Sequence, residues 1–170
     1  MIARSASAEV EPGSETDHGA VRPDNDAHLV VEANAGPSVG RLIDIPFWGG
    51  EVSGGLGVRY RTVSVLFDAH YARGRTDFDL GTQWGGLRTT FLWTPGRLRI
   101  GGGFDVVYLG IDRSYSGSIG HVGAGGFAHL GVDVVRFDEG AIEIAFRPEA
   151  TLFTSEIGAV SGTLVAGIRW

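Results

Sequence analysis

The sequence predicts an all-β protein, an eight-stranded antiparallel up-and-down β-barrel that crosses a membrane. Three observations predict this fold: apolar residues recur at every second position in eight successive runs, the connections between the runs alternate in length, and large aromatic residues collect at one end of the apolar faces. Alternation with a period of two is typical of strands that have two different faces. No window approaches the ~20 consecutive apolar residues of a membrane-spanning helix, so a helical membrane protein is excluded.

The eight alternating runs begin at about residue 27. They cover approximately residues 27–38, 50–60, 62–73, 80–93, 97–111, 120–135, 140–152 and 158–170. Each run is about as long as a tilted membrane strand, in which ~9–11 residues cross the hydrocarbon. We therefore expect eight transmembrane strands.

The connections between the runs differ in length. Three are short, at residues 60–61, 94–96 and 137–140, and four are longer, at about 39–49, 74–79, 112–119 and 153–157. Membrane β-barrels have short turns at one end and longer loops at the other. With an even number of strands, both termini should lie at the short-turn end.

One face of each run is apolar and the other carries nearly all the charge. In the last run, Val160, Leu164 and Ile168 alternate with Thr163 and Arg169. This alternation is also compatible with a soluble lipocalin-like barrel, whose apolar face would form the core. The orientation of the apolar face therefore needs a second criterion.

Aromatic residues supply that criterion. Tyr60, Trp93 and Trp170 lie on apolar faces at the short-turn ends of their runs, where membrane barrels carry an aromatic girdle at the lipid interface. A soluble barrel has no physical reason to align them at one level. Phe47 and Trp48 enter the second run from the opposite end and are candidates for the other girdle.

Composition divides the chain into two parts. Residues 1–26 hold six acids (Glu9, Glu11, Glu15, Asp17, Asp24 and Asp26) against Arg4 and Arg22; they show no hydrophobic period and are expected to form a disordered acidic tail. Residues 27–170 form the predicted barrel. The net charge of −6 and the lack of a basic stripe argue against nucleic-acid binding.

The polar face is expected to fill the barrel with a structural network of charges. Unpaired charges inside a narrow barrel would each cost several kcal/mol, so we predict the pairs Arg99 with Asp133, Glu143 with Arg169, and Arg88 with Asp68 or Asp105. Inward glycines predict tight packing, or alternatively a cavity. The predicted interior network comprises Glu32, Arg59, Asp68, Arg88, Arg99, Asp105, His129, Asp133, Glu143, Arg147, Glu149 and Arg169.

The chain end carries the most specific motif, Leu164-Val165-Ala166-Gly167-Ile168-Arg169-Trp170. A terminal aromatic preceded by apolar residues at alternate positions (Leu164, Ala166, Ile168 and Trp170) looks like the signal that the barrel-assembly machinery recognises. Over residues 27–170 the sequence resembles the small outer-membrane barrels typified by the OmpA transmembrane domain and OmpX. The resemblance implies a monomer in a bacterial outer membrane, in contact with membrane lipid and lipopolysaccharide. Such export requires a signal peptide, which is absent from residues 1–26.

These features predict a structural, anchoring or surface-contact barrel that acts through its extracellular loops and is not an open pore. One alternative is a lipocalin-like or OmpW-like barrel that binds or transports a small apolar ligand, because Trp84 and Phe127 share the inward parity. A second is a lipid-modifying enzyme, with candidates Ser114, Tyr115, Ser116, Ser118 and His121. No catalytic, metal-ligand or cofactor motif is recognisable, so we expect no enzyme and no cofactor, and expect His70 and His129 to join the network.

Overall fold

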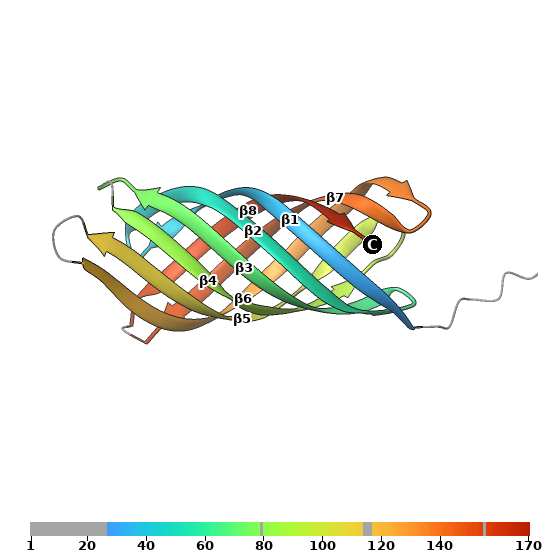
Figure 1. The fold of residues 1–170 in the computed structure, drawn as a ribbon, viewed down its shortest axis with the longest axis horizontal. Coiled ribbons are helices and arrows are strands. Elements are labelled where there is room, and N and C mark those ends of the chain that lie inside the picture. The colour runs from blue at the N-terminus through green and yellow to red at the C-terminus, as the bar shows by residue number, and fades with distance from the viewer. Residues whose placement is uncertain (1–26, 79, 114–116, 155) are drawn as a thin grey trace, which may run out of the picture.

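Eight antiparallel strands form a closed barrel in the computed structural model, which describes residues 27–78, 80–113, 117–154 and 156–170 (Figure 1). Each strand pairs with the next, and the first pairs with the last. The expected fold class is confirmed. The strands are β1 (Ala27–Leu42), β2 (Ile45–Tyr60), β3 (Val63–Thr76), β4 (Gly81–Trp93), β5 (Leu98–Arg113), β6 (Gly117–Phe137), β7 (Gly140–Phe153) and β8 (Gly158–Arg169).

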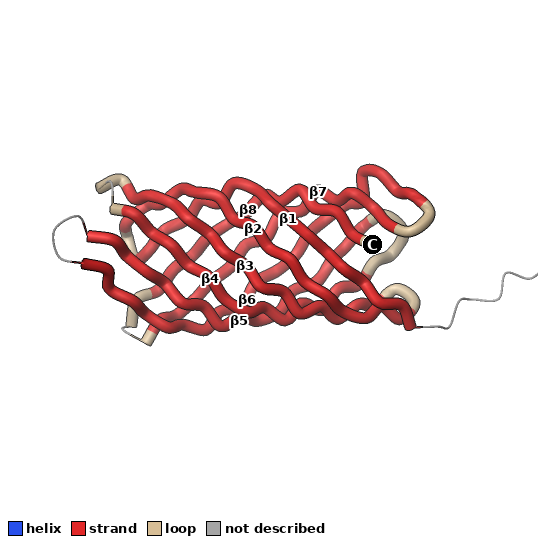
Figure 2. The backbone as a smooth tube through the Cα atoms, in the orientation of Figure 1, coloured by secondary structure: helices blue, strands red, loops and turns tan. Residues whose placement is uncertain are grey.

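Both termini of the barrel lie at one end, as the even strand number requires (Figure 1). We call this the terminus end; it also holds the turns that follow β2, β4 and β6. The opposite end, called the far end, holds the turns that follow β1, β3, β5 and β7. The described turns lie only at these two ends (Figure 2).

The expected difference in connection length is wrong. Residues 39–49, expected to form a long loop, instead extend β1 and β2 to a two-residue turn at residues 43–44, with Gly40 opposite Phe47. Pairing continues beyond the apolar band because backbone N–H and C=O groups form a ladder whatever side chains they carry. The turn after β3 spans only residues 77–80.

Three prolines lie inside strands without disrupting closure: Pro46 is the second residue of β2, and Pro37 and Pro148 lie deeper in β1 and β7. The β1–β8 pairing is interrupted between Ala35 and Ser38, where Pro37 lies, and the β6–β7 pairing is interrupted next to Pro148. Proline has no N–H to donate, so it is tolerated where a ladder hydrogen bond is missing. These local gaps explain how strands of 16 and 14 residues accommodate a proline.

The apolar face points outward and the charged face inward, as predicted. Phe67, Phe104, Phe146 and Leu164 are 60%, 56%, 47% and 52% exposed on the outside of the barrel, whereas Arg99 is 1% exposed in its interior. This arrangement is the inverse of a soluble barrel, whose apolar side chains fill the core. Among the described residues, no helix is long and apolar enough to cross a membrane.

Candidate functional site

The barrel interior contains most of the molecule's buried charge, contributed by inward positions of all eight strands. Alternation along each strand places these side chains in the lumen, where they form three groups of ion pairs. The buried charged residues are Glu32, Glu51, Asp68, Arg88, Arg99, Asp105, Asp133, Glu143, Arg147 and Arg169, and Glu149 is nearly buried, with its side chain 11% exposed.

The first group is a closed ring of five side chains, called the central ring. Arg99 donates to Glu32 Oε2 (2.8 Å) and to Glu143 Oε2. Glu143 Oε1 lies 2.6 Å from His129 Nε2, Arg147 Nε donates to His129 Nδ1 (3.1 Å), and Arg147 Nη2 donates to Glu32 Oε1 (3.3 Å). Arginine has no acceptor, so His129 Nδ1 must accept. With Nδ1 accepting, His129 donates from Nε2 to Glu143 Oε1.

The second group is centred on Arg88. Its guanidinium donates to Glu51 Oε1 (3.1 Å) and Glu149 Oε2 (2.9 Å), and its Cζ lies 4.7 Å from the centroid of the Phe127 ring. Two carboxylates and one aromatic face thus surround a buried cation. Thr151 Oγ1 donates to the other oxygen of Glu149 (3.1 Å).

The third group lies towards the terminus end. Asp133 Oδ2 accepts from Arg169 Nη2 (3.2 Å) and from Arg136 Nε (2.9 Å) and Nη2 (2.8 Å). β6 has a register shift between Asp133 and Val135, and a β-bulge of this kind re-aims the side chains that follow it. Arg136, which the sequence did not place in the network, thereby joins it from a partly exposed position.

The predicted ion pairs are wrong, although the predicted inward positions are right. Arg99 contacts Glu32 and Glu143 rather than Asp133, and Arg169 contacts Asp133 rather than Glu143. Arg88 forms its ion pairs with Glu51 and Glu149 rather than with Asp68 or Asp105. Strand tilt and stagger cause this difference, since they bring strands four apart, such as β1 and β5, together across the lumen.

Three predicted network members stand outside these ion pairs. Arg59 is half-buried and forms no ion pair with another described residue. Asp68 accepts a hydrogen bond from Thr90 Oγ1 (2.9 Å), and both carboxylate oxygens of Asp105 lack a hydrogen-bond partner within the described chain. Conversely, Glu51 was missed, although it has the same parity as Arg59 in the same strand, which would have identified it.

The packing interpretation of the inward glycines is supported at three positions. A Cβ at Gly55 would collide with Asp68 Oδ1, one at Gly125 would lie 2.5 Å from Asp105 Oδ1, and a Cβ at Gly131 would collide with Glu143 Oε1. Glycine at these points therefore makes space for buried carboxylates from neighbouring strands.

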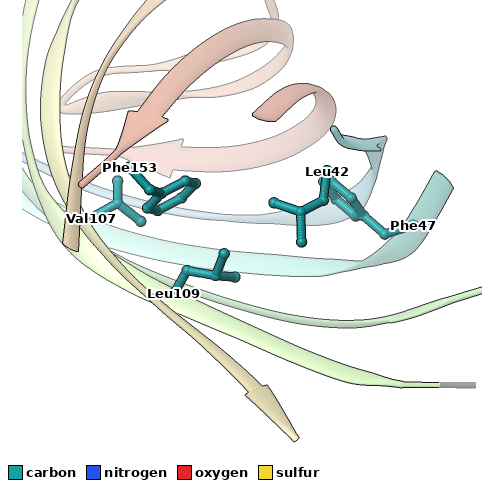
Figure 3. Packing of buried hydrophobic residues seen from close by; sticks show 5 residues of the cluster. All are labelled: Leu42, Phe47, Val107, Leu109 and Phe153. Atoms are coloured by element: carbon teal, nitrogen blue, oxygen red, sulfur yellow. The ribbon is translucent and has the colours of Figure 1, made fainter. Parts of the chain in front are cut away.

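The interior is apolar near the far end, contrary to a uniformly polar filling. Leu42, Phe47, Val107, Leu109 and Phe153 form a buried group, called the far-end cluster (Figure 3). Trp84 packs against it, with its ring centroid 4.7 Å from that of Phe47 in an edge-to-face arrangement. Phe47 thus points into the barrel and does not belong to a girdle.

The space within the far-end cluster is small. The cavity that it lines, together with Trp84, Glu149 and neighbouring residues, has a volume of about 20 Å³. Ligand sites for small molecules usually measure about 300–1,000 Å³. Trp84 lies at an apolar site inside the barrel, as the apolar-ligand alternative expects. The cavity there is too small for the ligand that this alternative requires.

A larger hollow of about 700 Å³ opens at the terminus end. Four arginines line it: Arg59, Arg61, Arg136 and Arg169. Arg169 connects this hollow with the third ion-pair group, because its Nη2 bonds to Asp133 while its Nη1 has no partner within the described chain.

The predicted girdle residues Tyr60, Trp93 and Trp170 are about half exposed on the outside at the terminus end. Tyr60 and Trp93 flank Val63, with which both pair in the sheet. Trp48, Tyr71 and Tyr108 are similarly exposed nearer the far end. Aromatic side chains therefore border the apolar outer surface on both sides.

The other sequence candidates have few described contacts. Residues 114–116 and the side chain of Ser118 lie outside the described residues, so the lipid-modifying alternative stays a prediction, as does the disordered tail at residues 1–26. Both ring nitrogens of the buried His70 lack a partner within the described chain. No group of three or more His, Asp or Glu among the described residues is arranged to hold a metal ion.

No family model and no curated protein matches the chain. Several solved structures match the chain at probability 1.00. The chain has the fold of the small eight-stranded outer-membrane barrels. Neisserial surface protein A gives a TM-score of 0.65 at 15% identity, over 85% of this chain and 97% of its own.

Two further structures give similar TM-scores and identities. Ail, the attachment invasion locus protein of Yersinia pestis, was solved in complex with the heparin analogue sucrose octasulfate. It gives a TM-score of 0.62 at 11% identity, over 84% of this chain and 99% of its own. The N-terminal barrel domain of Pseudomonas aeruginosa OprF gives a TM-score of 0.61 at 17% identity, over 85% of this chain and 100% of its own.

Proposed function

We propose that the protein is a monomeric β-barrel of a bacterial outer membrane, with a structural or surface-contact role and no open pore. The outward apolar band between two sets of aromatic residues carries this proposal. Trp48 and Tyr60 lie twelve positions apart on β2, which corresponds to ~40 Å along the strand and ~30 Å across a bilayer at a tilt of about 40°. A hydrocarbon core is about 30 Å thick.

The far end is the contact surface in this proposal. Arg41, Arg73 and Arg75 are exposed there on outward positions, and Arg75 pairs with Trp48 in the sheet. Guanidinium groups at this level favour the phosphate groups of lipopolysaccharide, because they bind phosphate oxygens in pairs. Ail, one of the similar structures, is an attachment invasion locus protein, which supports a surface-contact role without identifying a partner.

The terminal strand supports assembly by the outer-membrane machinery. Leu164, Ala166 and Trp170 are exposed on the outer face of the last strand, and Ile168 is half-exposed on the same face. This face of the chain end is accessible to an assembly factor before the barrel inserts. Replacing Trp170 with serine should lower the assembled fraction while leaving the amount of protein synthesised unchanged.

Membrane fractionation of the full-length gene product tests the proposal. We expect the protein in the outer-membrane fraction, extracted only by detergent and migrating faster on a gel before heating than after it, because a closed barrel resists unfolding by cold detergent. A detergent-free monomer that takes up a fluorescent fatty acid would contradict the proposal and favour the soluble alternative.

A further inference from the structure

The polar centre of the barrel offers too few protein partners for its own polar atoms. Within the described chain, both nitrogens of His70, both carboxylate oxygens of Asp105 and one oxygen each of Asp68 and Asn34 have no hydrogen-bond partner, and all four residues are at most 5% exposed. Buried polar groups in folded proteins bond to protein or to ordered water. These atoms therefore require water inside the barrel.

The balance of charge leads to the same requirement. The lumen contains seven described carboxylates and four arginines whose side chains are at most 8% exposed, and Arg136 bonds to Asp133 with its side chain 42% exposed. Carboxylates in excess of cations are stable in a narrow interior only if water or a proton compensates them. The carboxylates are Glu32, Glu51, Asp68, Asp105, Asp133, Glu143 and Glu149, and the arginines are Arg88, Arg99, Arg147 and Arg169.

At the terminus end a polar hollow adjoins the buried charges of the lumen. The hollow of about 700 Å³ at that end is lined by Arg169, whose Nη1 has no partner within the described chain. Arg169 bonds to Asp133, which also has one unpartnered oxygen. On the side of β6 and β8, polar atoms that need water thus continue from the hollow into the lumen, whereas Val30, Leu66 and Leu92 form a buried apolar group at the same end on β1, β3 and β4.

The far end differs in chemistry and packing. The far-end cluster draws its side chains from β1, β2, β5 and β7, and Trp84 of β4 and Ala159 of β8 pack against it. Figure 3 shows the five members of the cluster. With Trp84 and Ala159, side chains from six strands of the closed barrel pack together here, and the cavity that they line measures only about 20 Å³. An apolar constriction of this kind excludes ions because it does not hold a continuous column of water.

We propose that the interior is an aqueous chamber, accessible from the terminus end and closed at the far end by the far-end cluster, so that this cluster blocks ion passage and the ion pairs do not. The inference rests on the proposed membrane insertion. It assigns the closed state to five apolar residues and gives the charged network a structural role within a hydrated lumen.

Conductance in planar bilayers tests the seal. We expect the double variant Phe47→Ser and Phe153→Ser to raise single-channel conductance at least tenfold above that of the wild type. The matched network variant, Arg99→Gln with Glu143→Gln, removes a central ion pair at nearly constant volume and should conduct like the wild type. The inference is overturned if the network variant opens the barrel, or if an inserted, heat-modifiable seal variant conducts no more than the wild type.

Cysteine labelling tests the chamber with milder changes, because the chain has no cysteine of its own. Ser53→Cys places a thiol beside the central ring, since Ser53 Oγ accepts from Arg147 (3.3 Å), and Asp44→Cys marks the far-end turn. A charged, membrane-impermeant thiol reagent added to whole cells should modify Cys at 44 but not at 53, and should modify Cys at 53 after the inner side is exposed.

The outcomes of the labelling separate the two proposals. Failure of the Asp44→Cys variant to react from outside would overturn the proposed orientation in the outer membrane. Reaction at 44 together with protection of Cys at 53 from both sides would overturn the aqueous chamber alone. Adding Phe47→Ser and Phe153→Ser should expose Cys at 53 to the external reagent, and continued protection would contradict the assigned seal.

Discussion

Arg99 is 1% exposed and bonds to two carboxylates, Glu32 and Glu143. Its removal would leave both carboxylates buried without their principal cation, and breaking a buried pair in this way costs about 3–5 kcal/mol. We expect Arg99→Met to lower the free energy of unfolding by this amount, measured by urea denaturation in lipid vesicles. Arg97→Met, at an exposed position in the preceding turn, should change it by less than about 0.5 kcal/mol.

Gly103 and Gly126 are a matched pair of glycines in neighbouring strands. A Cβ at Gly103 would overlap the backbone oxygen of Thr89, whereas a Cβ at Gly126 would lie 3.6 Å from its nearest neighbour, the backbone oxygen of Gly103. We expect Gly103→Ala to lower the urea midpoint, at a cost of about 1–3 kcal/mol, and Gly126→Ala to leave it unchanged or raise it. Equal effects at the two sites would contradict the packing role of Gly103.

At the residue scale, the sequence predicts which side chains enter the lumen but not which of them meet. Alternation is fixed by strand geometry, so Glu32, Arg88 and Arg147 could be placed inside from parity alone. Partner choice depends on tilt and stagger across the whole barrel, which no local pattern encodes. The far-end cluster was not predicted, because Leu42 and Phe47 lie in a segment expected to be a loop.

Among the elements, the β1–β2 hairpin is informative because it replaces the expected loop. Its turn contains Ile43 at a φ of 56°, a conformation that is costly for a β-branched residue. Residues 36–50 contain glycine, proline and aspartate in proportions typical of a loop. Pairing of the two strands in the sheet overrides this local preference. The central parts of the eight strands were nevertheless predictable, because the alternation of apolar and polar residues does not depend on where strand pairing ends.

The strained turn gives a stabilising substitution. Ile43 is 59% exposed, and its N–H donates to the backbone oxygen of Gly158 (2.8 Å), a hydrogen bond that any non-proline residue can keep. We expect Ile43→Asn to raise the free energy of unfolding by about 1 kcal/mol, because asparagine tolerates positive φ. Asp44→Asn in the same turn is the control, with an expected change of less than about 0.5 kcal/mol. A lower urea midpoint for Ile43→Asn would refute the assignment of strain.

For the whole molecule, the orientation of the two faces can be tested by placing one charge at two depths. Phe104 lies outward in the middle of β5, and Gln83 lies outward near the far end, paired with Gly110. An arginine facing lipid costs about 2–4 kcal/mol at the bilayer midplane and about 0–1 kcal/mol near the interface. We expect Phe104→Arg to destabilise the inserted barrel by the larger amount and Gln83→Arg by the smaller. Similar costs at both depths would argue against a lipid-facing belt.

The pairing of Glu32 with Arg169 joins residues near opposite ends of the described chain. This contact closes the sheet, so the ladder can be completed only after the ribosome has released the last strand. Until then both outer strands present unpaired backbone groups that favour aggregation. The nascent polypeptide must therefore stay unfolded until β8 is complete, and a truncated product lacking β8 should be degraded rather than accumulate as a smaller barrel.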